Sequence, residues 1–335
     1  MGLVIFEKGN DFMIIPIFVP HEGCPNDCAF CNQRTISGKS SAPDMADAQK
    51  IIEEHLLSGG GYAEQIAFFG GSFTGIDTEK QNKYLSLAQR YIISGSVKSI
   101  RLSTRPDYID KDTVERLISY GVKNIELGAQ SMDEEVLSLA RRGHSSYDVQ
   151  KASEIINMSE AILGLQMMTG LPGDTPEKCM CTAKRFKELG AKETRIYPTV
   201  VLRGTHLEKM LLDGSYTPQT IEAAVDVSAR LYRYFKDSGI EILRIGLPDG
   251  DDLRQNYLAG AYHPSLGELV ISRDIRNRIE EALKGEYRAD ILVNPRFLSK
   301  VNGNKKCNIE YFKEKGITLN IILDESVSEY KIRKA

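Results

Sequence analysis

The amino-acid sequence predicts an α/β protein, a partial (β/α)6 barrel like that of TIM-type folds, followed by a small C-terminal α/β appendage. First, apolar runs of strand length alternate with helical patterns over most of the 335 residues. Second, residues suited to chemistry recur at the carboxyl ends of the expected strands, where barrels build their sites. Third, this repeat is lost near residue 250, which leaves a segment for a separate unit.

Six strand–helix repeats are expected in the first part of the chain. Their apolar runs show little alternation, as in parallel strands that are buried on both faces. We expect strands at 13–19, 65–70, 99–104, 124–129, 162–171 and 193–202, and helices at 44–58, 79–94, 112–120, 133–141, 146–158 and 175–189. Asp44, Ser131 and Thr175 are the expected N-caps of three of these helices.

A long helix at 218–238 and a strand at 241–247 should complete the first unit. Beyond it we expect a turn, a short strand and a helix within 263–283, and a late strand at 317–323. The predicted domains are therefore a barrel over 1–249 and an appended domain over 250–335. The appended domain is a candidate for substrate binding.

Composition narrows the class of protein. The formal net charge of −3 argues against a surface that attracts nucleic acid as a whole. No apolar run reaches the roughly 18–20 residues that a membrane-spanning helix needs. The start of the chain has no basic region and apolar core of a signal peptide. We therefore expect a cytoplasmic protein without a membrane partner.

Three of the six cysteines, Cys24, Cys28 and Cys31, lie together directly after the first expected strand. In a reducing compartment such a cluster indicates metal or redox chemistry more than disulfides. Three thiolates on one short loop can hold an iron–sulfur cluster and leave one metal position open. A zinc site with His21 as fourth ligand and a thiol redox loop are the alternatives.

The spacing Cys-x3-Cys-x2-Cys, with Phe30 before the last cysteine, resembles the radical S-adenosylmethionine (SAM) superfamily. Further motifs resemble the radical SAM half of the Elongator catalytic subunit and its stand-alone bacterial relatives, over about residues 10–247. These motifs are FFGGSFTGI (68–76), STRPDYI (103–109), IELGAQSMDEEVL (125–137), RRGH (141–144), GLPGD (170–174) and ILRIGL (242–247).

This resemblance implies that Cys24, Cys28 and Cys31 bind a 4Fe–4S cluster whose open iron is chelated by SAM. An electron from the cluster would cleave SAM to a 5′-deoxyadenosyl radical that abstracts hydrogen from a substrate. The implied partners are an electron donor such as flavodoxin or ferredoxin and an unidentified substrate, for which a tRNA nucleoside is one candidate.

The predicted cofactor-binding residues lie in the same motifs. They are Phe30, Gly70, Gly71, Ser72, Arg105, Glu126, Gln130 and Arg142. For several of them a structural role is the alternative: a tight turn at the glycines, an ion pair of Arg105 with Asp107, and an arginine partner for Glu126. His144 is expected to be structural, Asp174 to cap the following helix, and Tyr197 is a candidate for the cavity.

The resemblance ends where the Elongator subunit continues into an acetyltransferase-type domain. Only about 85 residues follow position 250, so we do not expect its acetyl-dependent chemistry. The segment 294–316 interleaves lysines with aromatic residues, which suits RNA or an ordinary solvated surface. A noncatalytic RNA-binding scaffold with a structural iron–sulfur or zinc loop is therefore the second hypothesis. Cys179, Cys181 and Cys307 make a poor second cluster.

Overall fold

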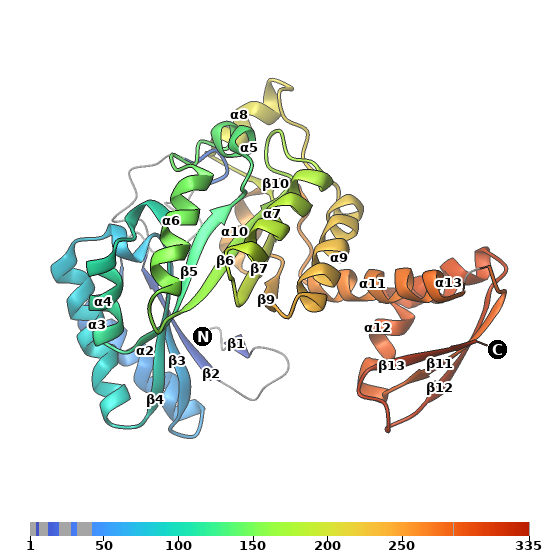
Figure 1. Ribbon diagram of the computed structural model, residues 1–335, viewed down its shortest axis with the longest axis horizontal. Coiled ribbons are helices and arrows are strands. Elements are labelled where there is room, and N and C mark those ends of the chain that lie inside the picture. Colours follow the sequence, from blue (N-terminus) through green and yellow to red (C-terminus); the bar gives the residue numbers. More distant parts are fainter. Residues whose placement is uncertain (1–4, 7–12, 20–27, 32–41, 284, 335) are drawn as a thin grey trace.

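The main sheet is a curled half-barrel of parallel strands (Figure 1). A computed structural model describes residues 5–6, 13–19, 28–31, 42–283 and 285–334. Within them the strand order is β1-β2-β3-β4-β5-β6-β7-β9, and only β1 is antiparallel to its neighbour. The strands are β1 (Ile5–Phe6), β2 (Met13–Val19), β3 (Ala63–Gly70), β4 (Val97–Thr104), β5 (Val122–Gln130), β6 (Ile162–Thr169), β7 (Glu193–Pro198) and β9 (Glu241–Ile245). The predicted partial barrel is confirmed, and the strand expected at 241–247 extends it.

Helices connect the parallel strands; most of them cover the outer face of the sheet, while α5 (Glu134–Leu139) and α8 (His206–Leu212) lie above its rim (Figure 1). The other helices are α2 (Met45–Ser58), α3 (Thr78–Ile93), α4 (Lys111–Ser119), α6 (Ser146–Asn157), α7 (Pro176–Glu188) and α9 (Ile221–Asp237). The main core lies between these helices and the sheet. Its largest side chains, among them Phe68, Tyr84, Phe186 and Phe235, are fully buried. This core fixes the strands whose carboxyl ends carry the site.

Capping residues start the helices close to the expected positions. Asp44 and Thr175 are the N-caps of α2 and α7, as predicted. Ser131 is not a cap: Asp133 takes that place in α5, because its carboxylate accepts from the backbone N–H of Val136 at 3.0 Å. The Ser131 hydroxyl instead accepts from the N–H of Asp133, which fixes the turn before the helix.

The run expected as one strand at 193–202 is two strands. Pro198, which has no N–H to donate, ends β7, and β8 (Val200–Leu202) leaves the main sheet. There β8 pairs antiparallel with β10 (Tyr257–Gly260), which follows α10 (Asp251–Asn256). Gly260 is required at this crossing, since its φ is +106° and a Cβ would lie 2.7 Å from the Thr199 carbonyl oxygen.

The prediction of a short strand within 263–283 is wrong. Residues 266–283 form one helix, α11 (Leu266–Leu283), which packs on α9. Leu266 and Val270 lie one turn apart and pack against Val225 and Ala229 of α9. Tertiary packing therefore overrides the strand propensity of the short apolar run.

A second, three-stranded sheet lies at the far end of α11 from the half-barrel (Figure 1). Its order is β12-β11-β13, with β11 (Arg288–Val293) parallel to β12 (Thr318–Leu323) and antiparallel to β13 (Tyr330–Lys334). The helices α12 (Leu298–Asn302) and α13 (Cys307–Glu314) lie between β11 and β12 in the chain. The late strand is confirmed, whereas the domain boundary at 249 stays a prediction, because β10 still pairs with β8.

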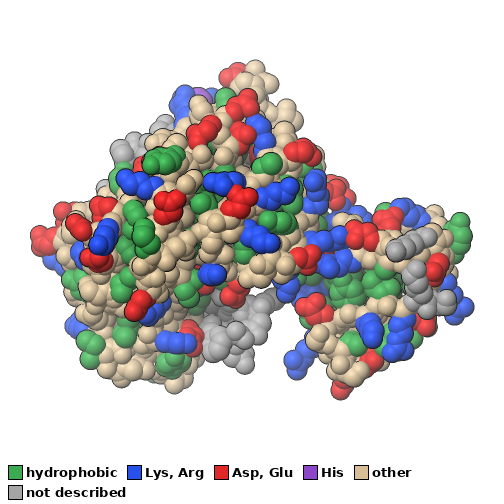
Figure 2. Space-filling view, in the orientation of Figure 1, with side chains coloured by type: hydrophobic (Ala, Val, Ile, Leu, Met, Phe, Trp, Pro, Cys, Tyr) green, Lys and Arg blue, Asp and Glu red, His purple; other side chains and the backbone are tan. Residues whose placement is uncertain are grey.

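Surface and hydropathy agree with the composition. On the face in Figure 2, acidic and basic side chains are interspersed over the half-barrel without a large field of one sign. Among the described residues, no helix combines the length and the apolar character that crossing a membrane requires.

Candidate cofactor-binding site

A cavity of about 370 Å³ opens where the parallel strands end. Nine of the predicted site residues line it: Cys28, Phe30, Cys31, Gly70, Gly71, Ser72, Arg105, Gln130 and Arg142. They come from the last residues of β3 and β5 and from the segments that follow β2, β3, β4 and β5, because the carboxyl ends of parallel strands meet on one rim. Cys24 lies outside the described residues. Glu126 is one layer deeper and does not line the cavity.

The cysteine loop is held in place by its backbone. The N–H of Ala29 donates to the Ala140 carbonyl at 2.9 Å, and the Ala29 carbonyl accepts from Leu207 at 2.8 Å. A tight turn follows, in which the N–H of Cys31 donates to the Cys28 carbonyl at 2.9 Å. These bonds present both thiols to the cavity from a fixed segment.

Two arginines surround the Cys28 sulfur. Arg142 Nη1 lies 3.2 Å and Arg105 Nη1 4.0 Å from Cys28 Sγ, and all three side chains are buried. Arg105 Nη2 also donates to the Arg142 carbonyl at 2.7 Å. The ion pair with Asp107, the alternative to a ligand role for Arg105, is present at 2.9 Å, although the Arg105 side chain is buried and not at the surface. Two positive charges at one sulfur suit a metal-bound thiolate, whose negative charge they offset.

The glycine segment after β3 permits close approach to its backbone. Gly70 has a φ of +114°, and a Cβ there would lie 2.9 Å from the Val19 carbonyl oxygen. Ser72 is fixed by a hydrogen bond of 2.8 Å with the Thr104 hydroxyl and accepts from the Arg105 N–H at 3.2 Å. The Ser72 hydroxyl therefore couples this turn to the end of β4.

Polar atoms without partners lie on the same wall. Gln130 Oε1 and Arg142 Nε are buried and have no hydrogen-bond partner in the part of the chain that the structure describes. Gln130 also has a φ of +67°, which is unusual for a residue with a Cβ. Buried polar atoms are normally satisfied, so these two indicate a ligand with complementary groups. The donor set, thiols beside unsatisfied polar atoms, fits a cluster with an amino-acid-bearing cofactor.

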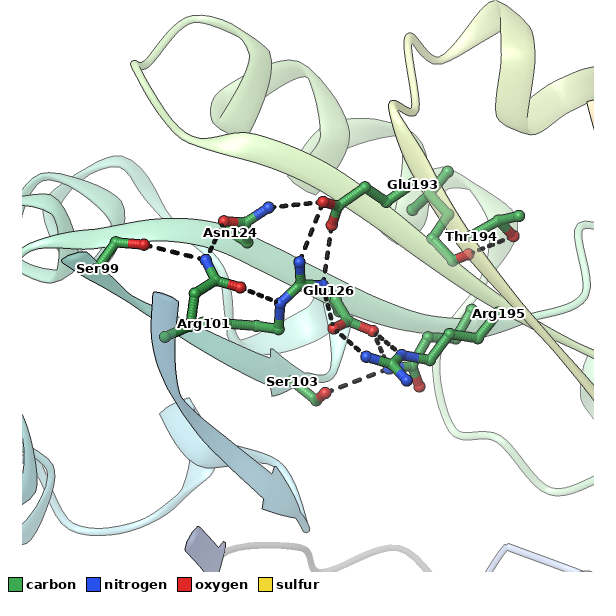
Figure 3. Close-up of polar contacts among 11 residues, drawn as sticks. Ser99, Arg101, Ser103, Asn124, Glu126, Glu193, Thr194 and Arg195 are labelled. Carbon is green, nitrogen blue, oxygen red and sulfur yellow. Dashed lines mark hydrogen bonds and ion pairs between the residues drawn. The ribbon is translucent and has the colours of Figure 1, made fainter. Parts of the chain in front are cut away.

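Glu126 belongs to a buried charge network under the cavity (Figure 3). Its carboxylate accepts from Arg195 at 2.6 and 3.0 Å and from Arg101 at 2.8 Å, and Arg101 also pairs with Glu193. Burial opposes ionisation, but Arg195 and Arg101 outweigh it and lower the pKa of Glu126 to about 2. The predicted arginine partner is confirmed, and a direct cofactor contact of Glu126 stays a prediction.

Phe30 and His144 fill the space behind the loop. The Phe30 ring lines the cavity and lies 5.7 Å from the Arg142 guanidinium carbon. His144 is buried, and its Nε2 lies 3.2 Å from the Ala129 carbonyl oxygen. Burial, with Arg142 and Arg105 nearby, lowers its pKa to about 3, so the imidazole is neutral. This fits the structural role that the sequence favours for His144.

Asp174 does not cap α7, contrary to the expectation. Thr175 takes the N-cap position, while Asp174 Oδ2 accepts from the Gly170 N–H at 2.9 Å and from the Cys179 thiol at 3.0 Å. Asp174 thus closes the loop after β6 on itself. Tyr197 lines the cavity as predicted.

Sequence reasoning missed Arg195 and Arg244, which also line the cavity. Each is an arginine next to apolar residues of a strand, and burial of such a charge is costly unless it is compensated. That signal was present in RIYP (195–198) and ILRI (242–245).

The fold and the cavity define an α/β half-barrel whose rim presents cysteines to a polar cofactor site. The family model "Radical SAM superfamily" matches residues 18–186, half of the chain, and the "Radical_SAM C-terminal domain" model matches residues 191–277. The chain therefore belongs to the radical SAM superfamily and is an enzyme of that superfamily. The family implies SAM and a 4Fe–4S cluster.

Among curated proteins, the chain is 26% identical over 282 residues to a tRNA uridine(34) acetyltransferase of Dehalococcoides mccartyi, covering 69% of this chain and 61% of the relative. It is 30% identical over 192 residues to Elongator complex protein 3 of Saccharomyces cerevisiae, covering 53% of this chain and 34% of the relative. The chain thus spans only part of these relatives. The predicted likeness to the Elongator catalytic subunit is confirmed.

Solved structures show the same fold. Elp3 of Methanocaldococcus infernus with an N-terminal deletion superposes with a TM-score of 0.63 at 20% identity, over 80% of this chain and 62% of that one. Coproporphyrinogen III oxidase of Escherichia coli, whose structure is described as that of a radical SAM enzyme, gives a TM-score of 0.50 at 18% identity, over 68% and 53%. At these identities the likeness concerns the fold alone.

Proposed function

We propose that this chain holds a 4Fe–4S cluster on Cys24, Cys28 and Cys31 and binds SAM in the adjoining cavity. The supporting observation is that the Cys28 and Cys31 thiols share one cavity wall with two unsatisfied buried atoms, Gln130 Oε1 and Arg142 Nε. When bound, cluster and SAM supply a 5′-deoxyadenosyl radical that abstracts hydrogen from the substrate, after a donor such as flavodoxin or ferredoxin has provided one electron.

The chain's own residues bind and orient in this proposal. Gly70 and Gly71 leave room for the amino-acid part of SAM to reach the backbone. Arg105 and Arg142 offset negative charge at the thiolates and the cofactor carboxylate. Gln130 offers its unsatisfied amide oxygen as an acceptor.

Ser72, Phe30 and Glu126 complete the predicted set. Ser72 holds the glycine turn in register with β4 through the Thr104 hydroxyl. Phe30 excludes water beside the Arg142 guanidinium. Glu126 acts from below, by fixing Arg195 at the cavity floor.

For the substrate we propose a tRNA nucleoside. The support is that several relatives are named tRNA uridine(34) acetyltransferase. The acetyl-dependent part of that activity is not proposed for this chain. A cytoplasmic location is proposed with it, since clustered cysteines stay reduced, and so free to bind metal, in a reducing compartment.

We further propose that the segment 250–335 forms a domain that contacts the RNA. Lys300, Lys305 and Lys306 line one concavity of about 370 Å³ beside His263, with Glu268 as its single acidic residue among the described lining residues. Three ammonium groups around a hollow offer charge to a phosphate backbone. This contact lies outside the half-barrel, so its loss should affect RNA affinity without removing the cofactor site.

Electron paramagnetic resonance on the anaerobically reconstituted, reduced protein tests the proposed function. We expect a 4Fe–4S signal that changes when SAM is added. The signal should vanish in Cys28→Ala and persist in Cys181→Ala, a matched control at an exposed cysteine. A signal that is indifferent to SAM would favour a noncatalytic scaffold, and stoichiometric zinc without acid-labile sulfide would show a zinc loop.

A further inference from the structure

The wall of the cavity formed by β7 and β9 carries charge that the cysteine side does not explain. The described lining residues of the cavity include four arginines and neither Asp nor Glu. Arg105 is paired with Asp107, and Arg142 lies against the Cys28 sulfur. The other two, Arg195 and Arg244, lie on the neighbouring strands β7 and β9, at the opposite end of the strand order from β2, which the cysteines follow.

Arg195 and Arg244 are direct cross-strand partners in the β7–β9 pair. Both residues line the cavity, and the two guanidinium groups are near enough for the charge of Arg195 to lower the pKa of Arg244. Such a pair is destabilising unless negative charge compensates it. Glu126 supplies that charge for Arg195, through hydrogen bonds of 2.6 and 3.0 Å.

Arg244 has no such compensation. Its Nε donates to the Gly246 carbonyl at 3.1 Å and its Nη2 to the Leu247 carbonyl at 3.5 Å. Among the described residues no carboxylate lies within ion-pair distance of it. Partial burial and the charge of Arg195 lower the pKa of Arg244, and they outweigh the opposing effect of Tyr197. A bound anion would offset both of the unfavourable effects.

The site beside Arg244 is rigid and has an apolar extension. The Arg195 guanidinium carbon lies 5.2 Å from the centre of the Phe69 ring, and its carboxylate partner is fixed by Arg101. An adjoining chamber of about 290 Å³ shares eight lining residues with the cavity, among them Tyr197, Pro248 and Cys31. It adds six apolar residues: Met168, Pro198, Val200, Leu202, Leu247 and Leu253. A ligand there meets a preorganised positive wall on one side and apolar surface on the other.

We propose that Arg244, supported by Arg195, binds an oxyanion of the substrate, a phosphate ester or a carboxylate, while an apolar or aromatic part of the substrate occupies the adjoining chamber. The proposal rests on the proposed function only in taking this cavity as the place where cofactor and substrate meet. A guanidinium fork matches both oxyanions in geometry.

Ligand-observed NMR titrations test the proposal with phenyl phosphate, benzoate and the neutral benzyl alcohol as probes. The protein is the reconstituted full chain, with saturating SAM. We expect at least one anion to bind about tenfold or more tightly than benzyl alcohol, and Arg244→Gln to remove that difference. The tighter anion identifies the source of the oxyanion. Arg244→Lys should retain part of the affinity, because it keeps the charge but loses the fork.

Arg185→Gln, at a half-exposed arginine on α7, is the matched control and should leave anion binding unchanged. Equal binding of benzyl alcohol and the anions to the wild type would overturn the proposal. Complete competition of SAM with the anions, or a loss of SAM affinity in Arg244→Gln, would also overturn it, since Arg244 would then serve the cofactor. A protein that fails the paramagnetic resonance test but still binds the anions would refute only the proposed function.

Discussion

Glu126 offers the sharpest test of how the cavity floor is stabilised. The change is Glu126→Gln, which keeps the shape of the side chain and removes its charge. The Glu126 side chain is 1% exposed. Its carboxylate pairs with Arg195 and also with Arg101, which has Glu193 as a second carboxylate partner. The variant leaves an excess positive charge in the interior, because Glu193 is the remaining carboxylate of the network.

Two independent estimates give the same magnitude. Removing one partner of a buried ion pair typically costs about 3–5 kcal/mol. The pKa of Glu126 falls from its ordinary value of 4.5 to about 2, and at roughly 1.4 kcal/mol per pKa unit this corresponds to about 3 kcal/mol. We therefore expect the free energy of unfolding of the cluster-free protein to fall by about 3 kcal/mol.

Urea denaturation followed by circular dichroism measures this change. Glu188→Gln, at an exposed carboxylate paired with Arg185, is the control and should stay within about 0.5 kcal/mol. The folded state holds the pKa of Glu126 below that of the unfolded chain. The wild type therefore loses this contribution as the pH falls from about 4.5 to 2, whereas Glu126→Gln should show a flatter profile there. A cost below 1 kcal/mol at pH 7 would refute the argument.

Three further predictions concern other parts of the molecule. Gly70→Ala should destabilise the folded protein by about 1–3 kcal/mol and weaken the SAM-induced spectral change, because residue 70 has a φ of +114° and its new Cβ would lie 2.9 Å from the Val19 carbonyl oxygen. Gly250→Ala is the control: it has open space around it and should have neither effect. His144→Gln should make the free energy of unfolding less sensitive to acid. The pKa of His144 is about 3 in the folded wild type, whereas the unfolded chain protonates His144 between pH 7 and 5, so the wild type should lose roughly 2 kcal/mol over that range. If the free energy of unfolding of the variant fell as steeply with pH, that would contradict the prediction. Replacing Lys300, Lys305 and Lys306 by Gln should reduce tRNA affinity and its salt dependence in filter binding but leave the cluster signal intact.

The parts of the fold that sequence could predict are those in which local signals agree with packing. The continuous apolar run Met13–Val19 forms β2 with the expected bounds, because a parallel strand buried on both faces needs no alternation. Asp44 and Thr175 were identifiable as caps, since each precedes a helical pattern. The split at Pro198 and the single helix α11 depended on the partners β10 and α9, which lie far away in the chain.

The candidate site was predictable on the cysteine side and not on the opposite wall. Cysteine spacing and glycine-rich strand ends carry a local pattern, so nine of the predicted residues line the cavity. A single arginine in a strand carries no such pattern. Arg195 and Arg244 are 49 positions apart, and only the register of β7 against β9 makes them neighbours.

The buried charge network below the cavity determines which arginines leave positive charge on its walls. Arg101, Glu126, Glu193 and Arg195 carry two charges of each sign, so the layer below the cavity is neutral as a whole. A neutral, fully hydrogen-bonded layer can be buried at tolerable cost and holds Arg195 in one orientation. The positive charge that faces the cavity is then left to Arg142 on one wall and Arg244 on the other. If both proposals hold, this cavity would offer two anion-binding positions, one at Arg142 beside the Cys28 thiol for the cofactor and one at Arg244 for the substrate.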